Sequence, residues 1–182
     1  GRSRTENHSA AFRFFSEAVW NWDEVCRLLI LDIVTYLIPD CEVWLVVDDT
    51  LCHKRGSRVA FGGVFLDAVL SSKKHKCFRY GNNWVTLGVV VKLPFRQDRY
   101  YCLNVLWRVC EKRGNKPRSE HRTRSQLAAE MVKIIAKWLP SSKLRLVADS
   151  AYVGQYLLKG RPANVDIIGP IPWDAELTEP LL

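Results

Sequence analysis

The sequence predicts an α/β fold in which a mixed β-sheet is flanked by helices, behind a helical N-terminal segment. Strand-like apolar runs fill the middle of the chain, and helix-like and strand-like segments then alternate toward its end. The chain has 182 residues, of which 48% are hydrophobic, so it can bury the core of one domain. We expect a helical segment over residues 1–40, the sheet within 41–170 and a proline-containing tail over 171–182.

The N-terminal segment shows two helical patterns. Apolar residues from Phe12 to Trp20 recur at helical spacing. Asn21 and Glu24 form a capping pair that predicts a second helix running to about Ile38, where Pro39 stops it. We expect the aromatic residues of this segment to be buried, namely Phe12, Phe14, Phe15, Trp20 and Trp22.

Three strands are predicted in the middle of the chain. The first covers residues 42–49, and a continuous apolar run over 84–95 is typical of a strand buried on both faces. The third, over 99–110, follows closely enough to pair with the second as a hairpin. Polar and basic loops are expected over 54–63 and 71–83.

The second half of the chain alternates helix and strand. Thr123 and Gln126 predict the capped start of a helix that ends at Pro140. A strand follows over 144–148, then a short helix capped by Ser150, and a last strand over 165–168. Three strands in a meander followed by helix, strand, helix and strand is the element order of ribonuclease H-like folds.

Two of the predicted strands end on carboxylates. In "EVWLVVDDTLCHKRG" the strand ends at Asp48 and Asp49, and in "KLRLVADSAYVGQ" it ends at Asp149. These two strands lie side by side in the predicted sheet, and carboxylates brought close together repel unless a cation lies between them. Mg²⁺ or Mn²⁺ suits such oxygen ligands, and two such ions can promote phosphodiester chemistry. The alternative is that each aspartate only forms a turn or caps a helix.

The alternation of side chains along the first strand does not decide between Asp48 and Asp49, because both faces are apolar. Position favours Asp49, which lies nearer the strand end. Asp48 would then not bind the metal itself but would help to position Asp49 or have a structural role. Thr50 would position Asp49 through its hydroxyl.

The formal net charge of +8 favours a polyanionic partner, with DNA first. Basic residues cluster after the first aspartate, in the 71–83 loop and before the capped helix. The alternative is that these clusters are solvated loops. The candidate DNA-contacting residues are Lys54, Arg55, Lys73, Lys74, Lys76, Arg79, Arg122 and Arg124.

The six cysteines include no C-x-x-C pair and lie mostly in apolar runs, which favours reduced, buried thiols. No signal-peptide start is visible, and the longest apolar stretch, over 25–38, contains Arg27 and Asp32. We therefore expect a cytoplasmic protein without a membrane partner.

Three stretches together, "WLVVDDTLCHKRG", "KHKCFRYGNNWVTLGVVVKLPF" and "LRLVADSAY", resemble the DDE-superfamily transposases of bacterial insertion sequences. The resemblance covers most of residues 8–178. It implies that Asp49 and Asp149 are the first and second catalytic carboxylates and hold Mg²⁺ or Mn²⁺. It further implies phosphodiester hydrolysis and strand transfer at transposon ends, with DNA as partner, and allows a homo-oligomer assembled on the DNA.

That family also uses a third carboxylate, a glutamate on a helix well beyond the second aspartate. The only later glutamates are Glu176 and Glu179, in the proline-containing tail. We therefore expect a C-terminally truncated, incomplete catalytic core with little or no activity. Two alternatives stay open: a DNA-binding relic of a transposase, and a ribonuclease H-like nuclease.

Overall fold

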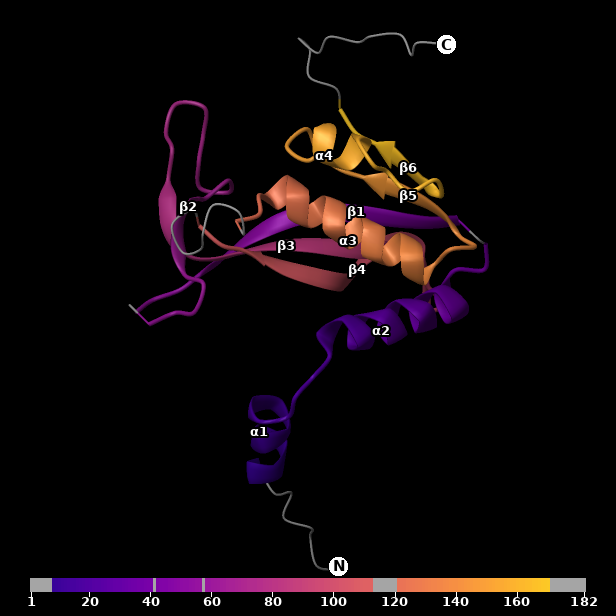
Figure 1. The fold of residues 1–182 in the computed structure, drawn as a ribbon, viewed down its shortest axis with the longest axis horizontal. Helices are drawn as coiled ribbons and strands as arrows, with labels where there is room; N and C mark the ends of the chain where they lie inside the picture. The colour runs from indigo at the N-terminus through magenta and orange to yellow at the C-terminus, as the bar shows by residue number, and fades with distance from the viewer. Residues whose placement is uncertain (1–7, 41, 57, 113–120, 171–182) are drawn as a thin grey trace, which may run out of the picture.

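The computed structural model describes residues 8–40, 42–56, 58–112 and 121–170. Four helices and six strands lie within them (Figure 1). The helices are α1 (His8–Ser16), α2 (Trp22–Leu37), α3 (Arg124–Trp138) and α4 (Gln155–Leu158). The strands are β1 (Glu42–His53), β2 (Gly63–Leu66), β3 (Phe78–Leu93), β4 (Arg96–Cys110), β5 (Lys143–Val147) and β6 (Val165–Ile168).

The strands form one mixed sheet in the order β2-β3-β1-β5-β6, with β4 also paired to β3. β1 is antiparallel to β3 and parallel to β5, and β3 and β4 form the expected hairpin. The predicted α/β class, a ribonuclease H-like mixed sheet flanked by helices, is therefore confirmed. The first strand and the strand after the capped helix are neighbours, as that fold requires.

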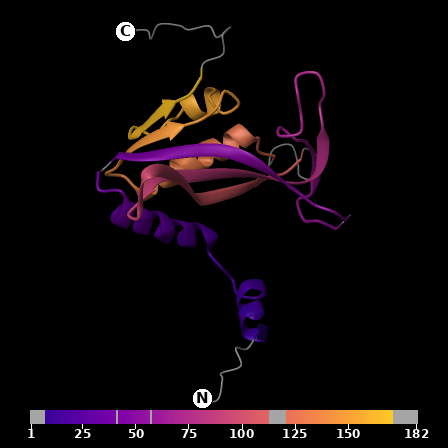
Figure 2. The same ribbon diagram turned by 180° about the vertical axis from the view of Figure 1, so that it is seen from behind.

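One face of the sheet forms the core. Val43, Leu45 and Val47 of β1 point to this face and are at most 3% exposed, and the register places Leu87 and Val89 of β3 beside them. α3 lies across this face in Figure 1. Figure 2 shows the sheet from behind, where no helix of the described residues crosses it. The sequence left open which face of β1 lies in the core, and the position of α3 decides it.

The start of α3 confirms the capping prediction. The Thr123 hydroxyl accepts a hydrogen bond from the Gln126 amide, and the Gln126 side chain accepts one from the Thr123 amide. This reciprocal pair satisfies two amides that the first turn of a helix leaves without partners. It therefore sets where α3 begins.

Several boundaries differ from the sequence-based expectation, and β4 begins at Arg96 instead of residue 99. β1 does not end at Asp49 but continues to His53, because β3 offers it a hydrogen-bonding partner along that whole length. β3 likewise starts at Phe78, inside the expected loop, and β2 was not anticipated. Ser150 does not cap α4, whose N-cap is Gly154.

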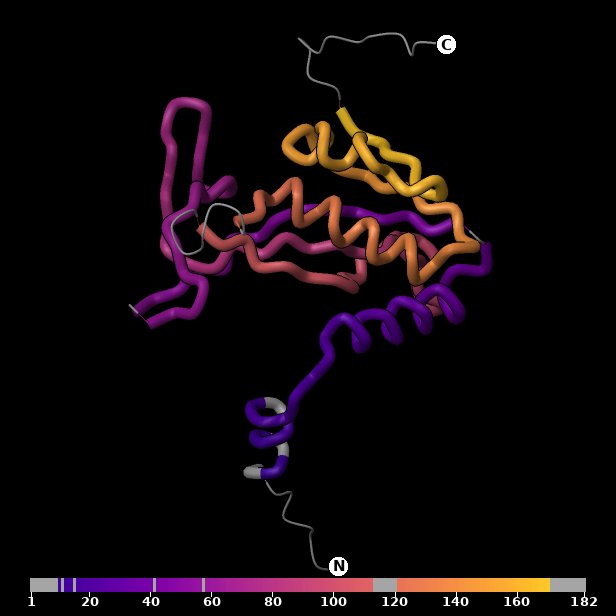
Figure 3. Tube along the Cα trace, viewed as in Figure 1, coloured from indigo at the N-terminus to yellow at the C-terminus, as the bar shows by residue number. Residues whose placement is uncertain are grey.

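The N-terminal segment forms the two expected helices, and the Asn21 side chain caps α2 by accepting a hydrogen bond from the Glu24 amide at 3.2 Å. The expected burial of its aromatic residues is wrong for Phe12, Phe14 and Trp22, which are 51–65% exposed. For Phe12 and Phe14 the reason is visible in the trace of Figure 3, because α1 stands away from the sheet. Trp22 is the first residue of α2 and lines an open pocket instead of entering the core.

α2 packs against the body of the molecule. Cys26, Ile30 and Ile33 are buried, and Asp23 forms an ion pair of 2.9 Å with Arg108 of β4. None of the helices within the described residues has the length and apolar character needed to span a membrane. Residues 171–182, with Glu176 and Glu179, lie outside the described part of the chain.

Candidate active site at the carboxyl ends of β1 and β5

The two predicted strand aspartates follow the same edge of the parallel β1–β5 pair. The last paired residues are Val46 and Val147, so Asp49 lies three residues beyond the pairing and Asp149 two residues beyond it. Since the strands run in the same direction, both aspartates leave the pair at its carboxyl end. The strands are therefore neighbours as predicted, and a shared site for the two carboxylates stays a prediction.

Asp49 lies on the core face of β1, and its side chain is 19% exposed. Two groups donate hydrogen bonds to its carboxylate. Arg124 Nη1 lies 2.8 Å from Oδ2 and 3.0 Å from Oδ1, and the Tyr152 hydroxyl lies 2.7 Å from Oδ1. Both carboxylate oxygens are therefore occupied by donors from α3 and from the segment after β5.

Asp149 is exposed and organises the turn that follows β5. Its Oδ1 accepts a hydrogen bond from the Ala151 amide at 2.9 Å, and its carbonyl accepts from the amides of Tyr152 and Val153 at 3.1 Å. Ser125 of α3 also donates to the Ala151 carbonyl at 3.2 Å. Asp149 thus positions Tyr152, and Tyr152 in turn contacts Asp49.

The electrostatics of Tyr152 and Arg124 follow from this arrangement. Burial raises the pKa of Tyr152 far above its ordinary value, and the hydrogen bond to the Asp49 carboxylate raises it further. Burial lowers the pKa of Arg124, but the hydrogen bond and the charge of Asp49 outweigh that effect and raise it overall. Both groups therefore stay protonated and keep donating to Asp49.

Asp48 and Thr50 lie on the opposite face of β1 from Asp49, as strand alternation requires. Asp48 Oδ1 accepts a hydrogen bond from the Asp49 amide at 2.8 Å, which connects it to the backbone of its neighbour. Thr50 lines a pocket on that face with Trp22, Trp84 and Trp107. No hydrogen bond joins its hydroxyl to Asp49 in the described part of the chain, so its supporting role stays a prediction.

The donor set at this edge suits a hard divalent cation in kind, because Asp49 and Asp149 supply carboxylate oxygens at neighbouring strand ends. The described residues include no group of three His, Cys, Asp or Glu side chains that could hold a metal ion. Arg124 already provides the positive charge at Asp49. A metal would therefore have to replace the guanidinium.

The predicted DNA-contacting residues fall into two groups. Six of them are exposed, on the segments that follow β1 and precede β3 and, for Arg79, at the start of β3 itself, namely Lys54, Arg55, Lys73, Lys74, Lys76 and Arg79. Figure 1 shows these segments projecting beyond the sheet at the end toward which β1 runs. The other two are also exposed, but each is paired with a carboxylate of the protein, Arg122 with Glu130 and Arg124 with Asp49.

One polar pair was missed by sequence reasoning. His53 Nε2 lies 2.6 Å from Oδ2 of Asp67, and the other oxygen of Asp67 accepts the amides of Val69 and Leu70 at 3.0 Å. The hydrogen bond that the Leu70 backbone amide donates to Asp67 lowers the pKa of this carboxyl. The hydrogen bond with His53 lowers the pKa further, against the opposing effect of burial. No local pattern marks this pair, because its members lie on different strands and loops.

Comparison with known proteins now identifies the class. The model of the family described as DDE superfamily endonuclease matches residues 2–181. The chain therefore belongs to the DDE superfamily endonuclease family. No curated protein and no solved structure matches it.

This membership confirms the coarser part of the resemblance, namely a DDE-superfamily nuclease or transposase. The class implies DNA as the substrate, and its enzymes generally use divalent metals.

Proposed function

We propose that this chain forms part of a DDE transposase active site in which Asp49 and Asp149 are the first two catalytic carboxylates. The reaction is hydrolysis of phosphodiesters at transposon ends followed by strand transfer to target DNA. The observation that carries the proposal is the arrival of both carboxylates at one end of the β1–β5 pair, in a chain of this family.

In the proposed site, Asp49 and Asp149 would hold Mg²⁺ or Mn²⁺, and Arg124 would have to leave Asp49 for this. When bound, such ions activate the attacking oxygen and stabilise the leaving oxygen of a phosphodiester. Tyr152 keeps its proton and holds Oδ1 of Asp49 in place, so that the carboxylate keeps one orientation. The displaced Arg124 is then free to pair with a DNA phosphate.

The exposed basic residues of the loops after β1 and before β3 would guide DNA to this edge. Lys54, Arg55 and the Lys73–Lys76 cluster carry positive charge beyond the end of the sheet. Phosphate contacts of this kind position a duplex without reading its sequence. DNA binding by these loops should therefore weaken steeply with salt.

The test is nicking of supercoiled plasmid in Mg²⁺ or Mn²⁺. Because the third carboxylate of the family is not assigned in this chain, we expect at most weak metal-dependent nicking, and we expect it to be lost in Asp49→Asn and in Asp149→Asn. Asp48→Asn is the matched control, because Asp48 is the adjacent carboxylate on the opposite face, and it should retain most activity. Nicking that persists in both site variants would contradict the assignment.

A second candidate function is DNA binding without catalysis, as in a relic of a transposase. It is favoured by one observation, the ion pair in which Arg124 occupies both oxygens of Asp49. Salt-dependent DNA binding with no nicking in either metal, and with no effect of the metal on affinity, would select this candidate over the first.

A further inference from the structure

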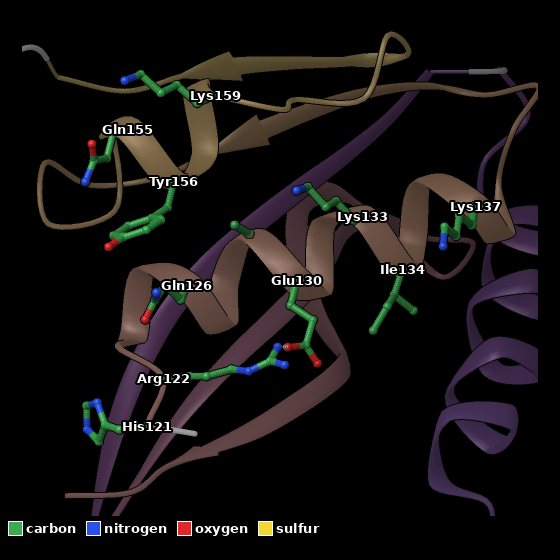
Figure 4. Close-up of a pocket in the computed structure, with 11 residues that line it drawn as sticks. His121, Arg122, Gln126, Glu130, Lys133, Ile134, Lys137, Gln155, Tyr156 and Lys159 are labelled. Atoms are coloured by element: carbon green, nitrogen blue, oxygen red, sulfur yellow. Dashed lines mark hydrogen bonds and ion pairs between the residues drawn. The ribbon is translucent and has the colours of Figure 1, made fainter. Parts of the chain in front are cut away.

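A groove lies between α3 and the segment that contains α4, on the side of α3 away from the sheet. Its volume is about 670 Å³. Figure 4 shows Tyr156 projecting from α4 toward α3, and Lys133 projecting from α3 toward α4. The groove also contains Lys137, Lys159 and the amide side chains of Gln126 and Gln155.

The groove carries an excess of positive charge. Within the described part of the chain, no carboxylate forms an ion pair with Lys133, Lys137 or Lys159. The acidic residue of the groove, Glu130, is paired with Arg122 and lies 3.6 Å from Arg108. Three ammonium groups therefore remain available to an anionic ligand.

The spacing of these charges suits a chain of phosphates. Lys133 and Lys137 are one helical turn apart on α3, or about 6 Å along its axis. Gly160 directly follows the lining residue Lys159 and adopts a left-handed conformation, with φ +80°. A β-carbon at Gly160 would lie 3.4 Å from Lys133 Nζ, so the Lys133 ammonium sits close against the backbone after α4.

The other lining groups favour a single strand over a duplex. Tyr156 is 41% exposed and offers an aromatic ring on which an unpaired base can stack, and the two glutamine amides can contact base edges. A basic groove combined with an aromatic platform is the usual arrangement for binding single strands. In a duplex the bases are stacked on each other and the ring has no partner.

The groove also leads toward the candidate active site. Gln126 belongs to the first turn of α3, and that same turn carries Arg124, which contacts Asp49. A strand lying along α3 from Lys137 to Gln126 would therefore arrive at the carboxyl end of β1.

We propose that this groove binds a single DNA strand, with Lys133, Lys137 and Lys159 on its phosphates and Tyr156 stacked on a base. The inference rests on the proposed function in taking DNA as the ligand, and it assigns a binding path separate from the basic loops. The strand in the groove is one that cleavage or melting has released from the duplex.

The test measures fluorescence anisotropy of a labelled thymidine 20-mer and of a 20-bp duplex across a salt series. The groove variant Lys133→Gln/Lys137→Gln/Lys159→Gln should bind the single strand more than tenfold more weakly. Its salt slope should fall by about 2, which corresponds to three lost phosphate contacts. Tyr156→Ala should cost roughly tenfold in single-strand affinity, and Tyr100→Ala, which removes an exposed tyrosine from the β3–β4 hairpin, should not.

The loop variant Lys73→Gln/Lys74→Gln/Lys76→Gln is the matched control, because it removes the same charge from the loop before β3. We expect it to weaken duplex binding more than single-strand binding. Single-strand affinity that is unchanged in the groove variant but lost in the loop variant would overturn the groove and keep the proposed function. Failure of the unmodified protein to bind either DNA would overturn both.

Discussion

Asp49 is the residue on which the site depends, and its environment is built from distant parts of the chain. Arg124 lies 75 residues away and Tyr152 lies 103 residues away, yet both donate to its carboxylate. The sequence analysis favoured Asp49 over Asp48 because of its place on the strand. It had no means of finding these two donors, since neither the spacing nor the residue type of Arg124 or Tyr152 marks such a contact.

Tyr152 is 1% exposed, and we expect its hydroxyl to stabilise the folded state. Tyr152→Phe removes one hydrogen bond to a charged acceptor and should lower the free energy of unfolding by about 2 kcal/mol. Urea denaturation at neutral pH measures this change. Tyr156→Phe is the control: Tyr156 is 41% exposed, and no described residue forms a hydrogen bond with its hydroxyl, so this variant should unfold like the unmodified protein.

The same pair of variants tests the sign of the pH dependence. The pKa of Tyr152 is raised in the folded state, so its contribution is complete below the pKa of an unfolded tyrosine, about 10, and is lost as pH rises above it. The unmodified protein should therefore lose stability above about pH 10 more steeply than Tyr152→Phe. Equal slopes would contradict the raised pKa.

At the scale of elements, the main difference from the sequence-based expectation is the length of β1. Polar residues from Asp48 to Thr50 suggested a strand end, but the β3 ladder continues to His53 while the β5 pairing stops at Val46. β1 is paired on both sides only as far as Val46, and beyond that residue it is paired with β3 alone. The continuous apolar pattern stops near the end of the part that is paired on both sides, so the predicted strand was too short.

Beyond that point, Asp67 fastens the loop that carries the Lys73–Lys76 cluster. Asp67 accepts hydrogen bonds from the amides of Val69 and Leu70, so Asp67→Ala should speed hydrogen exchange at these two amides and should lower the melting temperature. The pKa of Asp67 is lowered in the folded state. Its contribution to the free energy of unfolding is therefore present above the pKa of an unfolded aspartate, about 4. The difference from the unmodified protein should shrink as pH falls through the lowered pKa.

The control for this loop is Asp98→Ala. Asp98 pairs with Arg99 near the start of β4, and its side chain is 55% exposed, so its loss should leave exchange at Val69 and Leu70 unchanged. Accelerated exchange in both variants, or in neither, would mean that Asp67 does not hold the loop.

At the scale of the whole molecule, the order of the elements other than β2 and the adjacency of β1 and β5 could be predicted, because both follow from local periodicity and from the rules of mixed sheets. The exposure of Phe12, Phe14 and Trp22 could not be predicted, since an apolar helical stripe looks the same whether or not it meets a core. The groove between α3 and α4 was also missed, because its lysines are scattered along the sequence and come together only in the fold.

The charge distribution of the whole molecule matches its class. Basic loops extend past the carboxyl end of β1, a basic groove runs along α3, and Asp49 of β1 contacts Arg124 in the first turn of α3. A formal net charge of +8 favours binding of a polyanion, and under the proposals above the loops and the groove would direct DNA toward this edge. The carboxylates then mark the place where a phosphodiester would be held.

The most direct measurement of the central claim is a Mn²⁺ titration followed by calorimetry. We predict binding that is lost in Asp49→Asn and Asp149→Asn, retained in Asp48→Asn, and tighter in Arg124→Gln, because that change removes the cation that competes for Asp49. Equal heats in all of these proteins, or no binding even in Arg124→Gln, would show that the two aspartates do not form one metal site.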